Sequence, residues 1–508
     1  MGPLDPGSAD SDSRALPEGS EPGLRRQELL ARGIGLLAGG AAASLGFPAL
    51  VGAATSPLAE LRTTIGKGRV VTPTDAAYGA TRLPWNRRYD SIKPLAVALP
   101  ASAAHVAACV KWAEKHGVAF AIRAGGHSFA GQSSSKGLVI DLRRLSGVSS
   151  SGDKAQVGAG AKLGAVYPAL WTAGNRTIPG GTAPTVGVAG LTLGGGHGFL
   201  ARKLGLACDN VLSIEIVTAD GKHRTCSATK EKDLFWALRG AGFGSFGVVT
   251  SLLFKTTEIG PVATVSLEWE WARAAEIIDA WTTFMATAPD ELSTVLALRV
   301  PATVGGEPKL AVNGLFLGTK VDALAAMQPF IAATTPIKAN IVARGYDAAV
   351  HYFEGNQSAT RRFLGAASGY AYAPLTAAGR SALVDLVAAR HANPLLRNGG
   401  AVLFALGGAV GTVPKAATAF VHRSARFSVE LVGLWDTPAV SAANIAWMND
   451  ARTTITPYLS GEAVQNYADP NLTAWKAAYH GSNLARLRKV KKAVDPKNVF
   501  HHSQSIPL

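Results

Sequence analysis

The chain has 508 residues, which is too long for one small core, so at least two packed units are expected. Its composition, 47% apolar and 17% charged, is that of a globular protein and excludes a low-complexity or fibrous chain. The net charge of +15 raises the question of a nucleic-acid partner. The basic residues are scattered, however, and the one dense run at 486–492 is interpreted as a solvated helix face, so no nucleic-acid partner is expected.

Residues 1–53 form the first predicted segment. Its start is rich in Gly, Ser, Pro and acidic residues, which is typical of a disordered leader. Arg25 and Arg26 then precede a weakly apolar stretch, and 51–53 (VGA) has the small residues of a cleavage site. This order resembles a twin-arginine export signal. The alternative is an N-terminal helix or membrane anchor, but the glycines and proline disfavour a stable membrane span, so an exported protein, secreted or in the cell envelope, is expected.

Residues 54–261 alternate between short strands and helices. Helical periodicity predicts a helix over 102–116, with Ser102 as its N-cap and Gly117 as its stop. Further helices are predicted over 163–173 and 234–238, and strands over 118–122, 138–142, 154–160, 212–218 and 248–254. This mixture indicates an α+β domain.

Residues 262–460 have a different texture, because the glycine clusters thin out and longer alternating segments appear. Strands are predicted over 262–271, 292–300, 310–317, 402–407 and 427–434, and helices over 273–288, 321–333, 376–390 and 439–459. The pattern predicts a second domain built on an antiparallel sheet covered by helices.

Two glycine-rich segments are candidates for binding a phosphate-bearing ligand. The loop RAGGHSFAG at 123–131 follows a predicted strand, and its backbone amides could form an anion-binding nest beside His127. The segment 242–247 matches GxGxxG, but a helix precedes it and a strand follows it, which is the reverse of a dinucleotide-binding unit. Three cysteines, an odd number, argue against a disulfide framework, although Cys208 and Cys226 could pair. No metal site is expected.

Four blocks in the same order carry a resemblance to a known family. They are RAGGHSFAG at 123–131, the glycine-dense block at 184–210, DLFWALRGAGFGSFGVVT at 233–250 and the tail at 466–508. Together they resemble the FAD-linked oxidases of the vanillyl-alcohol-oxidase and p-cresol-methylhydroxylase type, in the berberine-bridge-enzyme-like group. The resemblance implies a two-part FAD-binding domain over 54–261, a substrate-binding domain over 262–460, and a C-terminal segment over 461–508 that returns to the FAD domain.

The resemblance also implies which residues bind the cofactor. His127 matches the histidine that is covalently bonded to the flavin 8α-carbon. Many members of the group have a second link through a cysteine, but Ala183 stands at that position, so a single link is expected. The expected cofactor-binding residues are Arg123, Ala124, Gly125, Gly126, His127, Ser128, Gln132, Ser133, Val186, Gly187, Gly190, Gly194, Gly195, Gly198, Gly247, Val248, Asn466 and Asn498, with Gln504 nearby.

The implied chemistry is hydride transfer from a C–H bond of an alcohol, sugar or amine to flavin N5. Tyr467 matches a tyrosine that faces the substrate, and Glu430 interrupts an apolar strand, where burial would raise its pKa toward that of a general base. His197, in the glycine-dense block, is expected to have a structural role. Val186 matches a gate that leaves space for O₂, which favours an oxidase that produces H₂O₂. A dehydrogenase with another acceptor, an oxygenating biosynthetic enzyme and a binding protein without redox activity are the alternatives, and the oligomeric state stays open.

Overall fold

The computed structural model describes residues 57–303, 305–355 and 360–508. The predicted leader and twin-arginine signal at 1–53 lie outside this described part. Within it, no helix combines the length and the apolar character that crossing a membrane requires.

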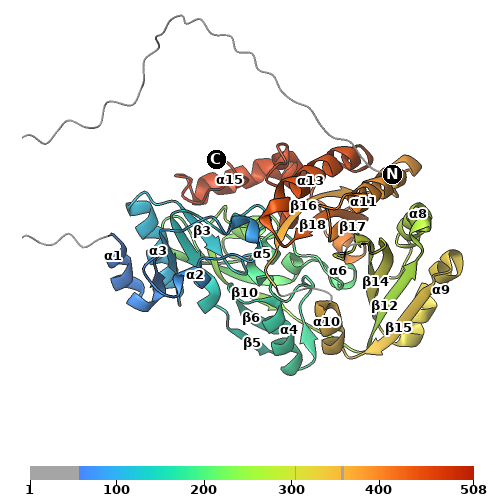
Figure 1. Ribbon diagram of the computed structural model, residues 1–508. Coiled ribbons are helices and arrows are strands. Elements are labelled where there is room, and N and C mark those ends of the chain that lie inside the picture. The colour runs from blue at the N-terminus through green and yellow to red at the C-terminus, as the bar shows by residue number, and fades with distance from the viewer. Residues whose placement is uncertain (1–56, 304, 356–359) are drawn as a thin grey trace, which may run out of the picture. The chain divides into compact units, whose positions relative to one another are not determined.

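The first sheet forms around the strand that leads into the loop at 123–131 (Figure 1). Its strands, in spatial order, are β1 (Val70–Val71), β2 (Ala96–Ala98), β4 (Leu138–Asp141) and β3 (Phe120–Arg123), and the last three are parallel. Helix α3 (Ala103–Lys115) makes the crossover from β2 to β3 and packs against α1 (Pro57–Ile65). As predicted, the Ser102 side chain caps α3 by accepting a hydrogen bond from the amide of His105, and Gly117 (φ +62°) ends it.

A five-stranded antiparallel sheet shares the core of the first sheet. Its strands, in spatial order, are β5 (Val148–Ser151), β6 (Lys154–Gly158), β10 (Val248–Lys255), β8 (Val211–Val217) and β9 (His223–Ser227). The connections carry α4 (Leu163–Thr172), α5 (Val188–Leu193), α6 (Ala201–Leu204) and α7 (Lys232–Ala237). Because α7 precedes the glycines at 242–247 and β10 follows them, this segment has the order that argued against a dinucleotide-binding unit.

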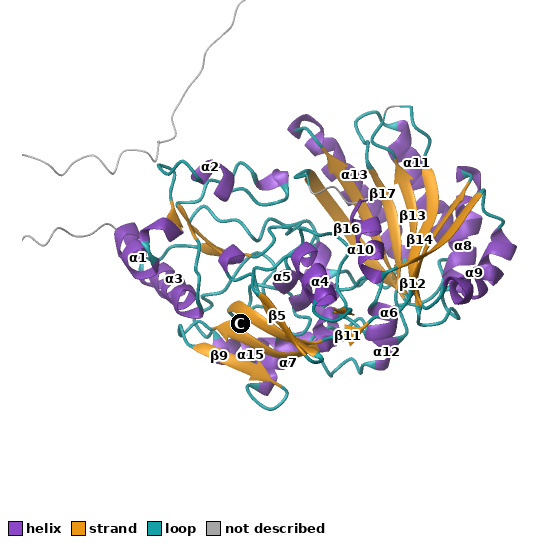
Figure 2. Ribbon diagram, turned by 90° about the horizontal axis from the view of Figure 1, so that it is seen from below, coloured by secondary structure: helices purple, strands orange, loops and turns teal. Residues whose placement is uncertain are grey.

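The third sheet is antiparallel and seven-stranded, as the alternating segments beyond residue 262 indicated. Its strands, in spatial order, are β15 (Lys338–Arg344), β12 (Val262–Trp269), β14 (Lys309–Leu317), β13 (Leu292–Val300), β17 (Gly399–Ala405), β18 (Phe427–Trp435) and β16 (Phe363–Ala371). The helices beside it are α8 (Ala274–Phe284), α9 (Lys320–Thr334), α11 (Ala377–Ala392) and α13 (Ser441–Ile455), as Figure 2 shows. The predicted α+β fold class, with a helix-covered antiparallel sheet, is confirmed.

The two faces of the seven-stranded sheet differ in character. Alternate residues such as Val429 and Leu431 pack against the helices in one apolar core, together with Trp281 of α8. Glu430 lies between them in the sequence and therefore faces the other way, opposite Ser368 of β16 and Val402 of β17. The core explains why the sheet folds, and the opposite face is left for polar side chains.

The C-terminal segment runs from the third sheet back to the first two. It contains α14 (Trp475–His480) and α15 (Leu484–Val494), and α15 packs against α7. The expectation of a solvated basic face holds for most of the run at 486–492, but Lys491 is fully buried. Its ammonium donates hydrogen bonds to the carboxylate of Asp495 (2.6 Å) and to the carbonyls of Ser245 (2.8 Å) and Phe500 (2.6 Å). This ion pair joins the chain end to the glycine segment before β10.

Candidate active site

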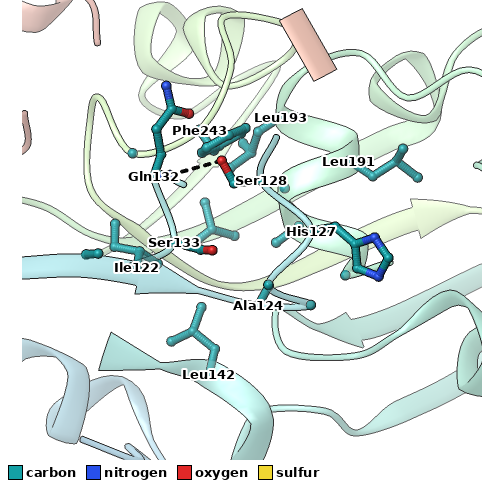
Figure 3. Close-up of a pocket in the computed structure, with 18 of the residues that line it drawn as sticks. Ile122, Ala124, His127, Ser128, Gln132, Ser133, Leu142, Leu191, Leu193 and Phe243 are labelled. Carbon is teal, nitrogen blue, oxygen red and sulfur yellow. Dashed lines mark hydrogen bonds between the residues drawn. The ribbon is translucent and has the colours of Figure 1, made fainter. Parts of the chain in front are cut away.

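Loops from distant parts of the chain enclose a cavity with about 1210 Å³ of space free of protein atoms, its open mouth included. Figure 3 shows the loop after β3, with His127 and Ser128, beside Leu191, Leu193 and Phe243. Apolar side chains and glycine backbone make up much of the wall, which suits a large, flat ligand. The predicted cofactor residues that line it are Ala124, Gly125, Gly126, His127, Ser128, Gln132, Ser133, Val186, Gly187, Gly190, Gly247 and Asn466.

The other predicted cofactor residues do not line the cavity. Arg123 is buried, and its guanidinium donates hydrogen bonds to the backbone carbonyls of Thr81 (3.0 Å), Arg82 (2.9 Å) and Ser133 (3.0 Å). Its side chain therefore holds the loop in shape instead of facing the cavity. The remaining members of this group are Gly194, Gly195, Gly198, Val248 and Asn498, and Gln504, which had been expected near the flavin, is likewise absent from the wall.

Two glycines let the loop after β3 touch the start of α5 directly. A Cβ atom added at Gly125 would lie 2.3 Å from the backbone nitrogen of Gly187, and one added at Gly187 would lie 2.3 Å from that of Gly125. Any side chain at either position would separate the two segments. This close approach brings His127 beside Thr185 and fixes one end of the cavity.

His127 lies on the cavity wall with its ring held on two sides. Its Nε2 is 2.8 Å from the hydroxyl oxygen of Thr185, and its ring stacks on Trp85 with centroids 4.3 Å apart and planes 20° apart. Burial, assisted by the positive charge of Lys162, lowers the pKa of His127 to about 3, so the imidazole is neutral at ordinary pH. Its Nδ1 makes no hydrogen bond within the described residues.

Polar atoms on the cavity wall that have no partner among the described residues show whether the wall suits a flavin. The hydroxyl of Ser133, on the wall, is buried and makes no hydrogen bond with any described residue. Such a group is costly unless a ligand completes it. Together with the His127 Nδ1, the apolar walls and the glycine backbone, it fits a ligand with a flat ring and a polar chain, as FAD has.

Tyr467 and His197 form a polar contact at the cavity. The Tyr467 hydroxyl lies 3.2 Å from Nε2 of His197, and Tyr467 belongs to the cavity wall. Burial lowers the pKa of His197 to about 4, so its neutral ring can accept the hydroxyl proton of Tyr467. Burial and the nearby Glu430 carboxylate raise the pKa of Tyr467, which keeps the phenol protonated.

Glu430 and Arg299 are neighbours of Tyr467 on the polar face of the seven-stranded sheet. Burial raises the pKa of Glu430 to about 7, against the opposing effect of the Arg299 guanidinium. Burial lowers the pKa of Arg299, and the acidic group of Glu430 acts in the opposite direction. In the described part of the chain neither side chain makes a hydrogen bond or an ion pair within 4.0 Å. Glu430 does not hydrogen-bond to Tyr467, so the two act on one another through the field alone.

The structure brings further side chains to the site. His197, which the glycine-dense block at 184–210 predicts to be structural, also contacts the Tyr467 hydroxyl. His502 lines the cavity, and its Nε2 is 3.0 Å from the carbonyl oxygen of Phe243. Nothing in the sequence pattern marked Trp85, because it precedes the predicted helix over 102–116 and belongs to none of the four blocks.

The described residues contain neither a disulfide bond nor a cluster of metal-binding side chains. Cys208 and Cys226 are buried free thiols, so the bridge considered between them does not form. Ala183 carries no thiol, and its carbonyl accepts a hydrogen bond from the amide of Val186 (3.2 Å). Among the described residues, no group of three or more His, Cys, Asp or Glu side chains could hold a metal ion.

Comparison with known proteins places the chain. Residues 94–227 match the FAD binding domain, and residues 465–507 match the berberine and berberine-like domain. An uncharacterised FAD-linked oxidoreductase of Bacillus subtilis is 34% identical over 453 residues, which cover 87% of this chain and 97% of the relative. A chitooligosaccharide oxidase of Gibberella zeae is 31% identical over 441 residues, which cover 82% and 87%.

Solved structures agree with these relatives. Phl p 4, a grass pollen allergen with glucose dehydrogenase activity, superimposes with a TM-score of 0.79 at 26% identity, over 89% of this chain and 99% of that chain. A variant of the same protein in which one isoleucine is replaced by valine is a glucose oxidase. With the fold, the cavity and the relatives in agreement, the chain belongs to the berberine-bridge-enzyme-like family of FAD-linked oxidoreductases.

Proposed function

We propose that this protein is an oxidase that carries FAD on His127, takes hydride from a C–H bond next to a hydroxyl group, and passes the electrons to O₂ to give H₂O₂. The observation that carries the proposal is the contact between the Tyr467 hydroxyl and the neutral His197 ring, on a cavity that also holds His127. A phenol that can pass its proton to an imidazole can serve as the general base that oxidation of an alcohol requires.

The protein's own residues handle the proton. When bound, the flavin supplies the electron-pair acceptor. The substrate hydroxyl donates its hydrogen bond to the Tyr467 oxygen, and Tyr467 donates its own proton to Nε2 of His197. As the hydride leaves carbon, the substrate proton moves to Tyr467 while the Tyr467 proton moves to His197. Glu430, whose pKa burial raises to about 7, acts on Tyr467 through its charge and helps to set when the phenol gives up its proton.

The substrate lies against the polar face of the seven-stranded sheet in this proposal. Strand register places several polar side chains on that face: Ser266, Arg299, Asn313, Ser368 and Glu430. A row of hydrogen-bonding groups opposite a flat apolar cavity suits a substrate with several hydroxyl groups. The names of the relatives support a sugar or oligosaccharide, because they act on chitooligosaccharides and glucose.

The reaction of the flavin with O₂ is proposed to depend on the cavity wall beside α5. Val186 lines the cavity there, and its short side chain leaves more space than a leucine or isoleucine. In Phl p 4, replacing one isoleucine by valine accompanies the change from glucose dehydrogenase to glucose oxidase, which supports the link between a shorter side chain and reaction with O₂. Because Ala183 has no thiol, the covalent link is single, through His127 alone.

The test starts from the purified holoprotein. Its flavin spectrum is recorded before and after acid precipitation, and the His127→Ala variant serves as the comparison. Yellow pellet from the wild type and colourless pellet from the variant are expected. Sugars, oligosaccharides and secondary alcohols are then screened for O₂ consumption and H₂O₂ release, with a quinone acceptor under nitrogen in parallel. Turnover with the quinone but not with O₂ would make the protein a dehydrogenase, and protein without flavin would overturn the proposal.

A further inference from the structure

Two side chains, Trp85 and Thr185, hold the His127 ring in place through contacts with the ring itself. Trp85 covers one face of the ring at a centroid distance of 4.3 Å, and Thr185 engages Nε2 at 2.8 Å. Trp85 and Thr185 are 100 residues apart in the sequence and belong to different segments. A histidine that only lined a cavity would not need its ring plane and one of its nitrogens fixed independently.

Trp85 is itself fixed by the segment 81–89, which lies across the loop that carries His127. The Trp85 amide donates a hydrogen bond to the carbonyl of Gly126 (3.0 Å), next to His127, and the Tyr89 hydroxyl donates to the carbonyl of Phe129 (2.7 Å). The neighbouring Asn86 is fully buried, and its side chain exchanges two hydrogen bonds with the backbone of Leu364 in β16 (2.9 and 3.2 Å). The indole therefore has a defined place against the His127 ring.

Thr185 decides which ring nitrogen is left for chemistry. Because Nε2 is held by the Thr185 hydroxyl, Nδ1 is the nitrogen without a partner among the described residues. The ring is also neutral, since the pKa of His127 is lowered to about 3, and a neutral nitrogen keeps the lone pair that a nucleophile needs. The ring plane, the nitrogen and the protonation state are thus all set before a cofactor arrives.

We propose that Trp85 and Thr185 are positioning residues for the covalent attachment of the flavin, Trp85 by setting the plane of the His127 ring and Thr185 by holding Nε2. The inference rests on the proposed covalent link. In the attachment, a bond forms between Nδ1 of His127 and the flavin 8α-carbon. One hydrogen leaves that carbon as a proton, and the proton on Nε2 leaves through the Thr185 hydroxyl. The two electrons released reduce the flavin ring, and O₂ takes them up to give H₂O₂, so the net loss from chain plus FAD is two hydrogens.

The experiment compares variants by how much of their flavin is covalently bound. Trp85→Ala and Thr185→Val are expected to bind FAD non-covalently. Their covalent attachment of FAD is expected to be about 3- to 10-fold slower than in the wild type. Trp85→Phe and Thr185→Ser, which keep the stack and the hydroxyl, are expected to restore attachment. The readouts are flavin retained in the acid pellet over time and the intact mass, which rises by FAD less two hydrogens. Neither readout depends on substrate turnover.

A matched control separates positioning from general loss of stability. The Trp171 ring contacts that of Tyr346, with centroids 5.9 Å apart and planes tilted by 46°, and it does not line the cavity, so Trp171→Ala removes a partly buried indole elsewhere. It is expected to attach flavin at the wild-type rate. Wild-type attachment rates in Trp85→Ala and Thr185→Val would overturn the inference and leave the covalent link standing. Wild-type protein that releases all its flavin in acid would overturn both, and slow attachment in Trp171→Ala as well would reduce the effect to one of stability.

Discussion

The two sides of the candidate site are built by different means. The cavity that holds His127 is made of loops whose backbones touch, as at Gly125 and Gly187, and its side chains are fixed by hydrogen bonds and stacking. The sheet face that carries Glu430 and Arg299 is regular, and these two side chains are half-buried and have no direct partner in the described residues. The difference indicates that folding fixes the shape of the cofactor side and leaves single polar atoms such as the Ser133 hydroxyl for a ligand, whereas the substrate side keeps ionisable side chains without a direct partner.

The largest effect is expected from a change on the cofactor side. Gly125→Val places side-chain atoms where the backbone of Gly187 lies, since even a Cβ would come within 2.3 Å. The two segments must separate, so we expect loss of bound flavin and a fall of about 3 kcal/mol or more in the free energy of unfolding. Flavin content and urea unfolding measure both. Gly79→Ala is the control, because a Cβ there meets no atom within 4 Å.

If Gly125→Val kept its flavin and its unfolding midpoint, the backbone contact would not define the cavity. The cofactor side would then not depend on touching backbones, as proposed above.

Much of the cofactor side could be predicted from the sequence, because backbone constraints leave a visible pattern. Glycines must recur wherever two main chains touch, and the loop at 123–131 follows a strand that alternation reveals. Arg123 belonged to the same block but turns into the protein, since a motif gives a residue's neighbours in sequence and not the direction of its side chain. Trp85 was missed because its contact with His127 spans 42 positions without a local signal.

The sheet side was harder to predict at its edges. The inner strands β13 and β18 were predicted almost to the residue, because each buries alternate apolar side chains against the helices. The two edge strands were missed. β15 is mostly exposed and so has little alternation, and β16 is rich in alanine and glycine, which have low strand propensity. Glu430 was identified because a carboxylate in an apolar strand is conspicuous, but its neighbours on the sheet depend on strand order, which no local pattern encodes.

The second effect lies where the two sides meet. Tyr467→Phe removes the hydroxyl that contacts His197, and we expect kcat to fall about 10²- to 10⁴-fold while flavin content is unchanged. Tyr346→Phe is the matched control, because its hydroxyl contacts Thr177 (3.1 Å) away from the cavity, so kcat should stay within about twofold of the wild type. Stopped-flow reduction of the flavin by substrate under nitrogen measures the step directly. Equal rates in Tyr467→Phe and the wild type would remove Tyr467 from the chemistry.

The third effect concerns the ionisation of Glu430 on the face of the seven-stranded sheet. Burial raises the pKa of Glu430 from 4.5 to about 7, so the folded protein keeps a proton that the unfolded chain has released between these values. Its contribution to stability is therefore present below about pH 4.5 and is lost as the pH rises to about 7. Glu430→Gln should remove this dependence, so the difference in unfolding free energy between variant and wild type should change by up to about 3 kcal/mol across that range.

Unfolding curves at several pH values measure this difference. Parallel pH profiles in the variant and the wild type would mean that the pKa of Glu430 is the same in the folded and unfolded protein. The sheet face would then not perturb the ionisation of Glu430.

The smallest effect separates the two half-reactions on the cofactor side. Val186→Ile adds one methylene to the cavity wall without touching the contact between Tyr467 and His197. We expect the rate of flavin reoxidation by O₂ to fall about tenfold, the loss that a partial steric block of about 1.4 kcal/mol produces, while the rate of flavin reduction by substrate stays near that of the wild type. Both rates come from one stopped-flow series, so each serves as the control for the other. An equal fall in both rates would mean that the extra methylene displaces the flavin. Hydride transfer depends on where the flavin ring lies relative to the sheet, whereas a block on O₂ alone would slow only reoxidation.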